Sequence, residues 1–228
     1  MRDTPIRPAV LRHWYLPALL LAFYPASFWI PHRWTWENGV IENAQLLMLI
    51  CAGAWAVAAW WRLRPAPTAP LALCAVPIWA VLAGREASWG AIFFGPLAVT
   101  HAGPVFSSSH LWYKPGVAPV ALALLLAAFA GACRYRIDRL FAGAIAARCF
   151  PWMAMAVAIA AGAAATCAEG RLHCVVPPHG QGFEELAELV GYAALFIAQA
   201  VLLRHGYSVR AGARTAARSL APERLPTD

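Results

Sequence analysis

The chain has 228 residues, of which 61% are hydrophobic and 13% are charged. Soluble domains carry about 45–50% apolar and about 25% charged residues, so one soluble core of this size cannot bury the apolar excess. The formal net charge is +7, but the basic residues lie between long apolar runs, and no basic stripe alternates with stacking aromatics. The composition predicts a protein whose partners are membrane lipids, and it argues against nucleic acid as a partner.

Six apolar segments come close to the length of about 20 helical residues that crosses a bilayer core. We therefore predict an all-α, polytopic membrane helix bundle with about six transmembrane helices. A cleaved signal peptide is the alternative for the first segment. The predicted spans are Trp14–Ile30, Val40–Trp61, Leu71–Phe94, Val117–Cys133, Phe150–Cys167 and Leu186–Leu203.

The arginines predict the orientation of these helices. If every segment crosses, fourteen arginines fall on one side, and the other side holds Arg33, Lys114 and Arg171. Arg85 then lies inside the third span. Because cytoplasmic loops carry an excess of basic residues, this pattern predicts cytoplasmic N and C termini in a bacterial inner membrane.

Two regions follow from the same pattern. Residues 1–206 form the transmembrane domain, and residues 207–228 form a basic cytoplasmic tail that we expect to be disordered.

The acidic residues and histidines gather on the opposite, outer side. Some of this asymmetry is expected because the basic residues are held inside, so an exposed residue such as Glu37 can simply be solvated. The outer set consists of Glu37, Glu42, Glu86, Glu169, Glu184, Glu185, Glu188, His32, His101, His110, His173 and His179.

The first group that needs another explanation is Arg85-Glu86-Ala87-Ser88, at the end of an apolar segment. Charged groups in hydrocarbon are costly and usually face the bundle interior. Neighbouring helical residues point about 100° apart, so Arg85 and Glu86 cannot satisfy only each other. We expect Glu86 to find a partner on a second helix.

The second group opens the segment that begins near Val40. Asn38 is a predicted N-cap, and Glu42 lies within the first turns, where a carboxylate is favoured by the helix dipole. Glu42 and Gln45 share a helical face, and they point inward if that face meets the third helix. Capping and a role in a site both remain open for Glu42.

The third group is Glu184, Glu185 and Glu188, which crowd the start of the last segment. Carboxylates this close tend to retain a proton or to recruit a cation. The long outer loop from residue 91 to 116 contains His110, and loops of that length often act as lids or binding loops.

Two cysteines fall on the outer side. The short separation between Cys167 and Cys174 predicts a loop-closing disulfide if the compartment is oxidising. A metal site that adds His173 and His179 is the alternative, although no Cys-x-x-Cys pair is present.

Two motifs carry a resemblance to known sequences. Residues 37–42 read Glu-x-Gly-x-x-Glu, and residues 86–90 read Glu-x-Ser-Trp-Gly. In these motifs the chain resembles an uncharacterised group of bacterial multi-pass membrane proteins. The group usually has an acidic residue at the position of Arg85 and Gln at that of Ala91. The resemblance implies a helical membrane fold and no particular activity.

Three functions are compatible with this pattern. The leading hypothesis is a hydrolase or transferase that acts at the outer face on a lipid or lipid-linked envelope substrate, through acid/base chemistry or a divalent metal ion. The alternatives are a proton- or cation-coupled carrier or channel and a non-catalytic membrane assembly protein. The sequence does not decide whether the chain is an enzyme.

The candidate residues follow from the leading hypothesis. The candidate catalytic residues are Glu86, Glu42, Glu185, His110 and Ser88. The candidate ligands of a divalent metal are Glu86, Glu185, Glu188 and His110, and the supporting polar residues are Arg85, Glu37, Gln45 and Glu184.

Overall fold

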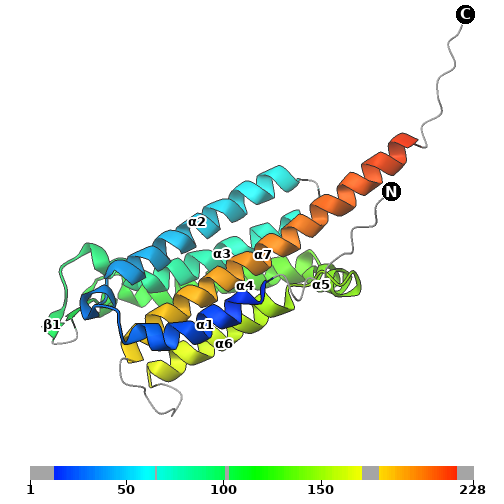
Figure 1. Ribbon diagram of the computed structural model, residues 1–228. Helices are drawn as coiled ribbons and strands as arrows, with labels where there is room; N and C mark the ends of the chain where they lie inside the picture. The colour runs from blue at the N-terminus through cyan, green and yellow to red at the C-terminus, as the bar shows by residue number, and fades with distance from the viewer. Residues whose placement is uncertain (1–12, 65, 101–102, 171–179, 220–228) are drawn as a thin grey trace, which may run out of the picture.

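The computed structural model describes residues 13–64, 66–100, 103–170 and 180–219, with side chains as far as Arg204. This part of the chain is a bundle of long α-helices that lie side by side, with one short β-hairpin at one end (Figure 1). The predicted all-α helical class is therefore confirmed. We call the end that carries β1 the hairpin end and the opposite end, which carries α5, the α5 end.

Successive long helices run in alternating directions between these two ends (Figure 1). The first half of the bundle consists of α1 (Tyr15–Ser27), the 3-10 helix η2 (His32–Trp34), α2 (Val40–Leu63) and α3 (Ala69–Glu86). The segment that follows at the hairpin end consists of η3 (Ser88–Phe93), the antiparallel strands β1 (Ala98–Thr100) and β2 (Gly103–Val105), and η4 (Ser108–His110). The second half consists of α4 (Lys114–Arg134), α5 (Ile137–Ala146), α6 (Trp152–Ala168) and α7 (Gly180–Ser219).

Four of these helices are long and apolar enough to cross a membrane, namely α2, α3, α4 and the part of α7 up to Arg204. The apolar helices α1 and α6 are shorter, with 13 and 17 residues. At a rise of 1.5 Å per residue they extend about 20 and 26 Å, against a hydrocarbon core of about 30 Å. By length and composition, these four helices are therefore candidate membrane spans.

The third predicted span is wrong at its end, because α3 stops at Glu86 and not at Phe94. Ser88, Trp89 and Gly90 all have positive φ angles, which an α-helix cannot accommodate. Trp89 folds back so closely that a Cβ on Gly84 would lie 2.9 Å from its ring. Arg85 therefore lies in the last turn of α3 and not deep inside a span.

Two other helices also differ from the prediction. Helix α5 was not predicted, because the arginines that flank it, Arg134, Arg136 and Arg148, are typical of a loop. The exposed Arg136 donates two hydrogen bonds to Asp138, at 3.1 and 3.0 Å, and thereby lowers the pKa of that carboxyl group. Helix α7 begins at Gly180, six residues before the predicted start, and continues as a helix to Ser219.

The centre of the bundle is α7, which packs against α6, α1, α2 and α3. Small residues permit this close contact, as is usual between helices in lipid. Ala161 of α6 is fully buried, and a Cβ added to Gly191 of α7 would lie 3.3 Å from the Cβ of Ala161. Helix α4 is peripheral, and Ala128 is its buried residue.

The contact between Gly191 and α6 gives a test of this packing. We expect Gly191→Val to lower the thermal stability of the detergent-solubilised protein, because overpacking a close interface costs about 1–3 kcal/mol. The matched control is Gly162→Val in α6, where an added Cβ meets nothing within 4 Å. Equal melting temperatures for the two variants would contradict the described α6–α7 interface.

Candidate functional site

Three polar residues follow one face of α7 at intervals of seven: Glu185, Tyr192 and Gln199. Seven residues make nearly two helical turns, so the three lie about 10 Å apart along one stripe. We call them the α7 polar stripe. Each forms a hydrogen bond with α2 or α3, so the stripe joins the three helices.

The contacts of the stripe form three levels. At the first level, Gln45 Nε2 of α2 donates to the backbone oxygen of Glu185 at 2.6 Å. At the second, Tyr192 Oη donates to Glu86 Oε1 at 2.6 Å. Glu86 does find its partner on another helix, as expected. Gln45 contacts α7.

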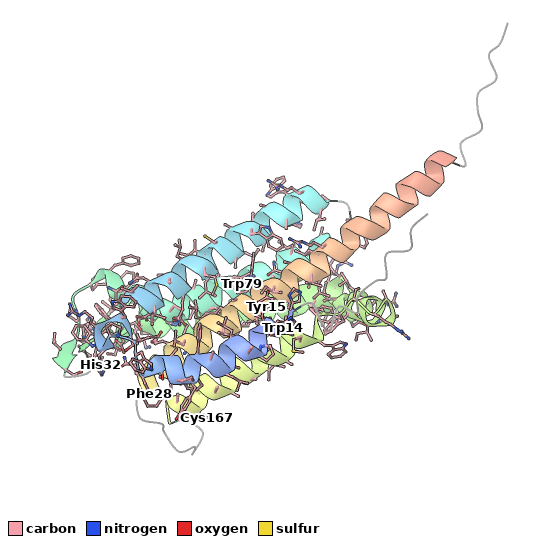
Figure 2. All side chains as sticks on the ribbon, in the orientation of Figure 1. Trp14, Tyr15, Phe28, His32, Trp79 and Cys167 are labelled. Atoms are coloured by element: carbon pink, nitrogen blue, oxygen red, sulfur yellow. The ribbon has the colours of Figure 1, made fainter. Side chains whose placement is uncertain are left out.

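The third level lies nearer the α5 end. Trp79 Nε1 of α3 donates to Gln199 Oε1 at 2.6 Å. Figure 2 shows Trp79 near the middle of the bundle, whereas His32, Phe28 and Cys167 lie toward the hairpin end. Tyr192, Trp79 and Gln199 were not predicted as site residues. The interval of seven residues that links Tyr192 and Gln199 to Glu185 is the signal that could have revealed them.

Arg85 lies among the carboxylates at the hairpin end. Its guanidinium donates to Glu188 Oε1 and, at 3.1 Å, to Tyr192 Oη. It also lies 3.6 Å from Glu86 and 4.0 Å from Glu169. Glu86 and Glu188 are 5% and 9% exposed, so both carboxylates depend on these few contacts for stabilisation.

Six carboxyl groups come together here, and we call them the carboxylate cluster: Glu42, Glu86, Glu169, Glu184, Glu185 and Glu188. In the part of the chain that the structure describes, Arg85 is the cation that contacts them. Among the described side chains, the cluster therefore brings together more carboxyl groups than cationic groups.

Two acceptor atoms in this region are buried and have no hydrogen-bond partner among the described residues: Gln45 Oε1 and Glu185 Oε2. The Gln45 side chain is fully buried. Unsatisfied buried acceptors are rare and destabilising. Two of them on neighbouring residues form a place where an incoming donor or proton would be stabilised.

The remaining carboxylates near the start of α2 have structural partners. Glu42 accepts a hydrogen bond from the backbone N–H of Asn38, and Glu37 accepts one from the backbone N–H of Phe106. The predicted N-cap is wrong, because Gly39 occupies that position and Asn38 precedes it with φ 58°. Capping of the helix entrance accounts for the position of Glu42, and Glu37 fastens the β2 side of the hairpin.

Two predicted catalytic residues lie apart from these contacts. His110 is exposed on η4 and forms no ion pair with a described residue. Ser88 lies in the left-handed turn after α3 and has no base hydrogen-bonded to it among the described residues. A serine nucleophile requires such a base for activation.

The predicted metal ligands do not form a ligand set. Among the described residues, no three His, Cys, Asp or Glu side chains have an arrangement that could hold a metal ion. Glu86 is occupied by Tyr192 and Glu188 by Arg85, and His110 lies on an exposed turn. The prediction of Glu86, Glu185, Glu188 and His110 as joint ligands is therefore not supported.

Cys167, at the end of α6, takes part in a disulfide. Cys51, Cys74, Cys133 and Cys149 carry free thiols. Cys174, the predicted partner, lies outside the described residues, as do His101, His173 and His179. The Cys167–Cys174 pairing stays a prediction.

The fold and its apolar helices define the chain as an α-helical membrane protein with a buried polar region at one end. Comparisons with protein-family models, curated proteins and solved structures found no match.

The contact between Arg85 and Glu188 can be tested by a double-mutant cycle with Arg85→Leu and Glu188→Leu. Arg85→Leu removes the cation that contacts the buried Glu188 carboxylate, and Glu188→Leu removes a carboxylate from the half-exposed Arg85. The double variant should therefore lose less stability than the sum. We expect a coupling free energy of about 0.5–3 kcal/mol, measured by unfolding in mixed micelles. The control cycle removes the exposed pair Arg136 and Asp138, whose coupling should be smaller. A cluster pair with no coupling would contradict the described site.

Proposed function

We propose that the chain is a six-span protein of a bacterial inner membrane, with cytoplasmic termini and the hairpin end in the periplasm. Two observations support this orientation. Arg134, Arg136 and Arg139 gather at the α5 end, as cytoplasmic loops require. Cys167 lies toward the hairpin end and is in a disulfide (Figure 2), and disulfides persist on the oxidising side of the membrane.

Cysteine labelling in intact cells tests this topology. A membrane-impermeant maleimide should label the His110→Cys variant in intact cells and the Arg139→Cys variant only after lysis. Both positions are exposed. A site that stays unlabelled in intact cells is therefore shielded by the membrane and not by burial in the protein. Wild-type protein controls for the free thiols. Labelling of the Arg139→Cys variant in intact cells would reverse the orientation.

The proposed activity is acid/base hydrolysis or group transfer on a lipid or lipid-linked envelope substrate at the periplasmic face. The observation that carries it is the unpartnered Oε2 of Glu185. Tyr192, Arg85 and the Asn38 N–H engage Glu86, Glu188 and Glu42 respectively. Glu185 thus has a buried carboxyl oxygen that no described residue engages.

In this mechanism the Glu185 carboxylate is the general base. It removes a proton from a water or hydroxyl nucleophile as that nucleophile attacks the ester or phosphate, and it returns the proton to the leaving group. Gln45 holds the helix turn of Glu185 in place through the 2.6 Å bond to its backbone oxygen. Arg85, Glu188, Glu86 and Tyr192 fix the neighbouring helices.

The test is the Glu185→Gln variant, reconstituted in liposomes of a bacterial polar lipid extract. Mass spectrometry of lipids and released soluble compounds should show products with the wild type and at least about a hundredfold less with the variant, since general acid–base catalysis contributes about 10²–10⁴-fold. Stability should change little, because the substituted oxygen has no partner. Asp138→Asn, an exposed carboxylate at the other end, is the matched control and should retain the wild-type rate.

A proton- or cation-coupled carrier is the second candidate. It is favoured by Gln199, which is 7% exposed, because its buried Nε2 has no hydrogen-bond partner among the described residues and lies further toward the α5 end than the carboxylate cluster. The same liposomes, loaded with a pH-sensitive dye, distinguish the two functions. If the wild type forms no product but conducts protons, and the Glu185→Gln variant loses this proton flux, the enzyme hypothesis is overturned in favour of the carrier.

A further inference from the structure

A second polar feature lies at the α5 end, remote from the carboxylate cluster. A cavity of about 140 Å³ opens between α2 and α7, lined by Trp55, Ala58, Ala59, Arg62, Leu63, Leu203 and Arg204. Alanines on α2 leave this space. The lining is apolar apart from two arginines, one from each helix.

The two arginines are exposed and form no ion pair with any described residue. Asp138 is the described acidic residue at this end, and Arg136 already binds it. The neighbouring Arg64 is occupied differently, because its guanidinium lies over the ring of Trp60, 3.3 Å from the ring centroid. Arg62 and Arg204 therefore leave positive charge uncompensated at the cavity.

The depth of this cavity matches the phosphates of a lipid leaflet. Arg62 is 22 residues beyond the start of α2, and Arg204 is 24 residues beyond the start of α7. These separations correspond to about 33 and 36 Å of helix, which exceeds the hydrocarbon thickness of about 30 Å. In the proposed membrane placement, on which this inference rests, both guanidinium groups lie just beyond the hydrocarbon, whereas Trp55 and the alanines lie within it.

We propose that this cavity binds the phosphate headgroup of an anionic phospholipid through Arg62 and Arg204. A guanidinium presents paired N–H donors that match phosphate oxygens. The space is large enough for a phosphate group, since one water takes about 30 Å³. The apolar wall of Trp55, Ala58 and Leu203 receives the first methylenes of an acyl chain. This site is independent of the proposed catalytic activity.

Native mass spectrometry of the full-length protein, released from micelles with added phosphatidylglycerol or phosphatidylcholine, tests the proposal. Wild-type protein should retain phosphatidylglycerol in preference to phosphatidylcholine. The Arg62→Gln/Arg204→Gln variant should retain about tenfold less phosphatidylglycerol, since each basic residue near an anionic lipid strengthens binding severalfold. The matched control, Arg134→Gln/Arg139→Gln, removes the same charge from exposed positions at the same end and should bind as the wild type does.

Two further arms separate the alternatives. Ala58→Leu fills the cavity without changing the charge, and it should also reduce phosphatidylglycerol retention. Glycerol 3-phosphate supplies the phosphate without acyl chains and should compete weakly. Equal loss in the two arginine double variants, or retention by Arg62→Gln/Arg204→Gln at the wild-type level, overturns the site. Full competition by glycerol 3-phosphate overturns the lipid as its occupant.

Discussion

The arrangement of this bundle depends on the hydrogen bonds of the α7 polar stripe. In lipid, no water is available to satisfy a polar side chain, so each must find a partner inside the protein. Tyr192 and Gln199 meet Glu86 and Trp79, which are themselves seven residues apart on α3. A one-residue slip of either helix would rotate its side chains by about 100° and break both contacts. The stripe thus fixes the register of α3 against α7 where apolar packing alone would permit alternatives.

The need of buried polar groups for partners inside the protein also determines which carboxylates at the hairpin end are free to react. Glu86 and Glu188 are held by neutral and cationic donors from neighbouring helices, and they stabilise the bundle. Glu185 is engaged through its backbone oxygen, so its side chain takes no part in fixing the register. Carboxylates that look equivalent in the sequence therefore differ in their hydrogen-bond partners. This difference supports the proposal of Glu185 as the base.

Composition and hydropathy predicted the helical membrane class, because both depend on the solvent and not on particular contacts. They also predicted that Glu86 needs a second helix. They could not identify Tyr192 as the partner, because that depends on which face of α7 meets α3. Helix α5 was missed because the arginines that flank it are typical of a loop. The end of α3 was missed because the turn after Glu86 is made by Ser88 and Trp89, residues that rarely have positive φ.

Helix dipoles explain the positions of several charged residues here, but not the position of Glu86. Glu42 lies in the first turn of α2, and Arg62 and Arg85 lie in the last turns of α2 and α3. Each charge has the sign that the helix dipole stabilises at that end. Glu86 is the last residue of α3, beside a negative helix end that disfavours a carboxylate. Its position is stabilised instead by Tyr192 and Arg85. A buried carboxylate placed against its own helix dipole has no local structural explanation, so the reason for it lies in the site that α2, α3 and α7 form together.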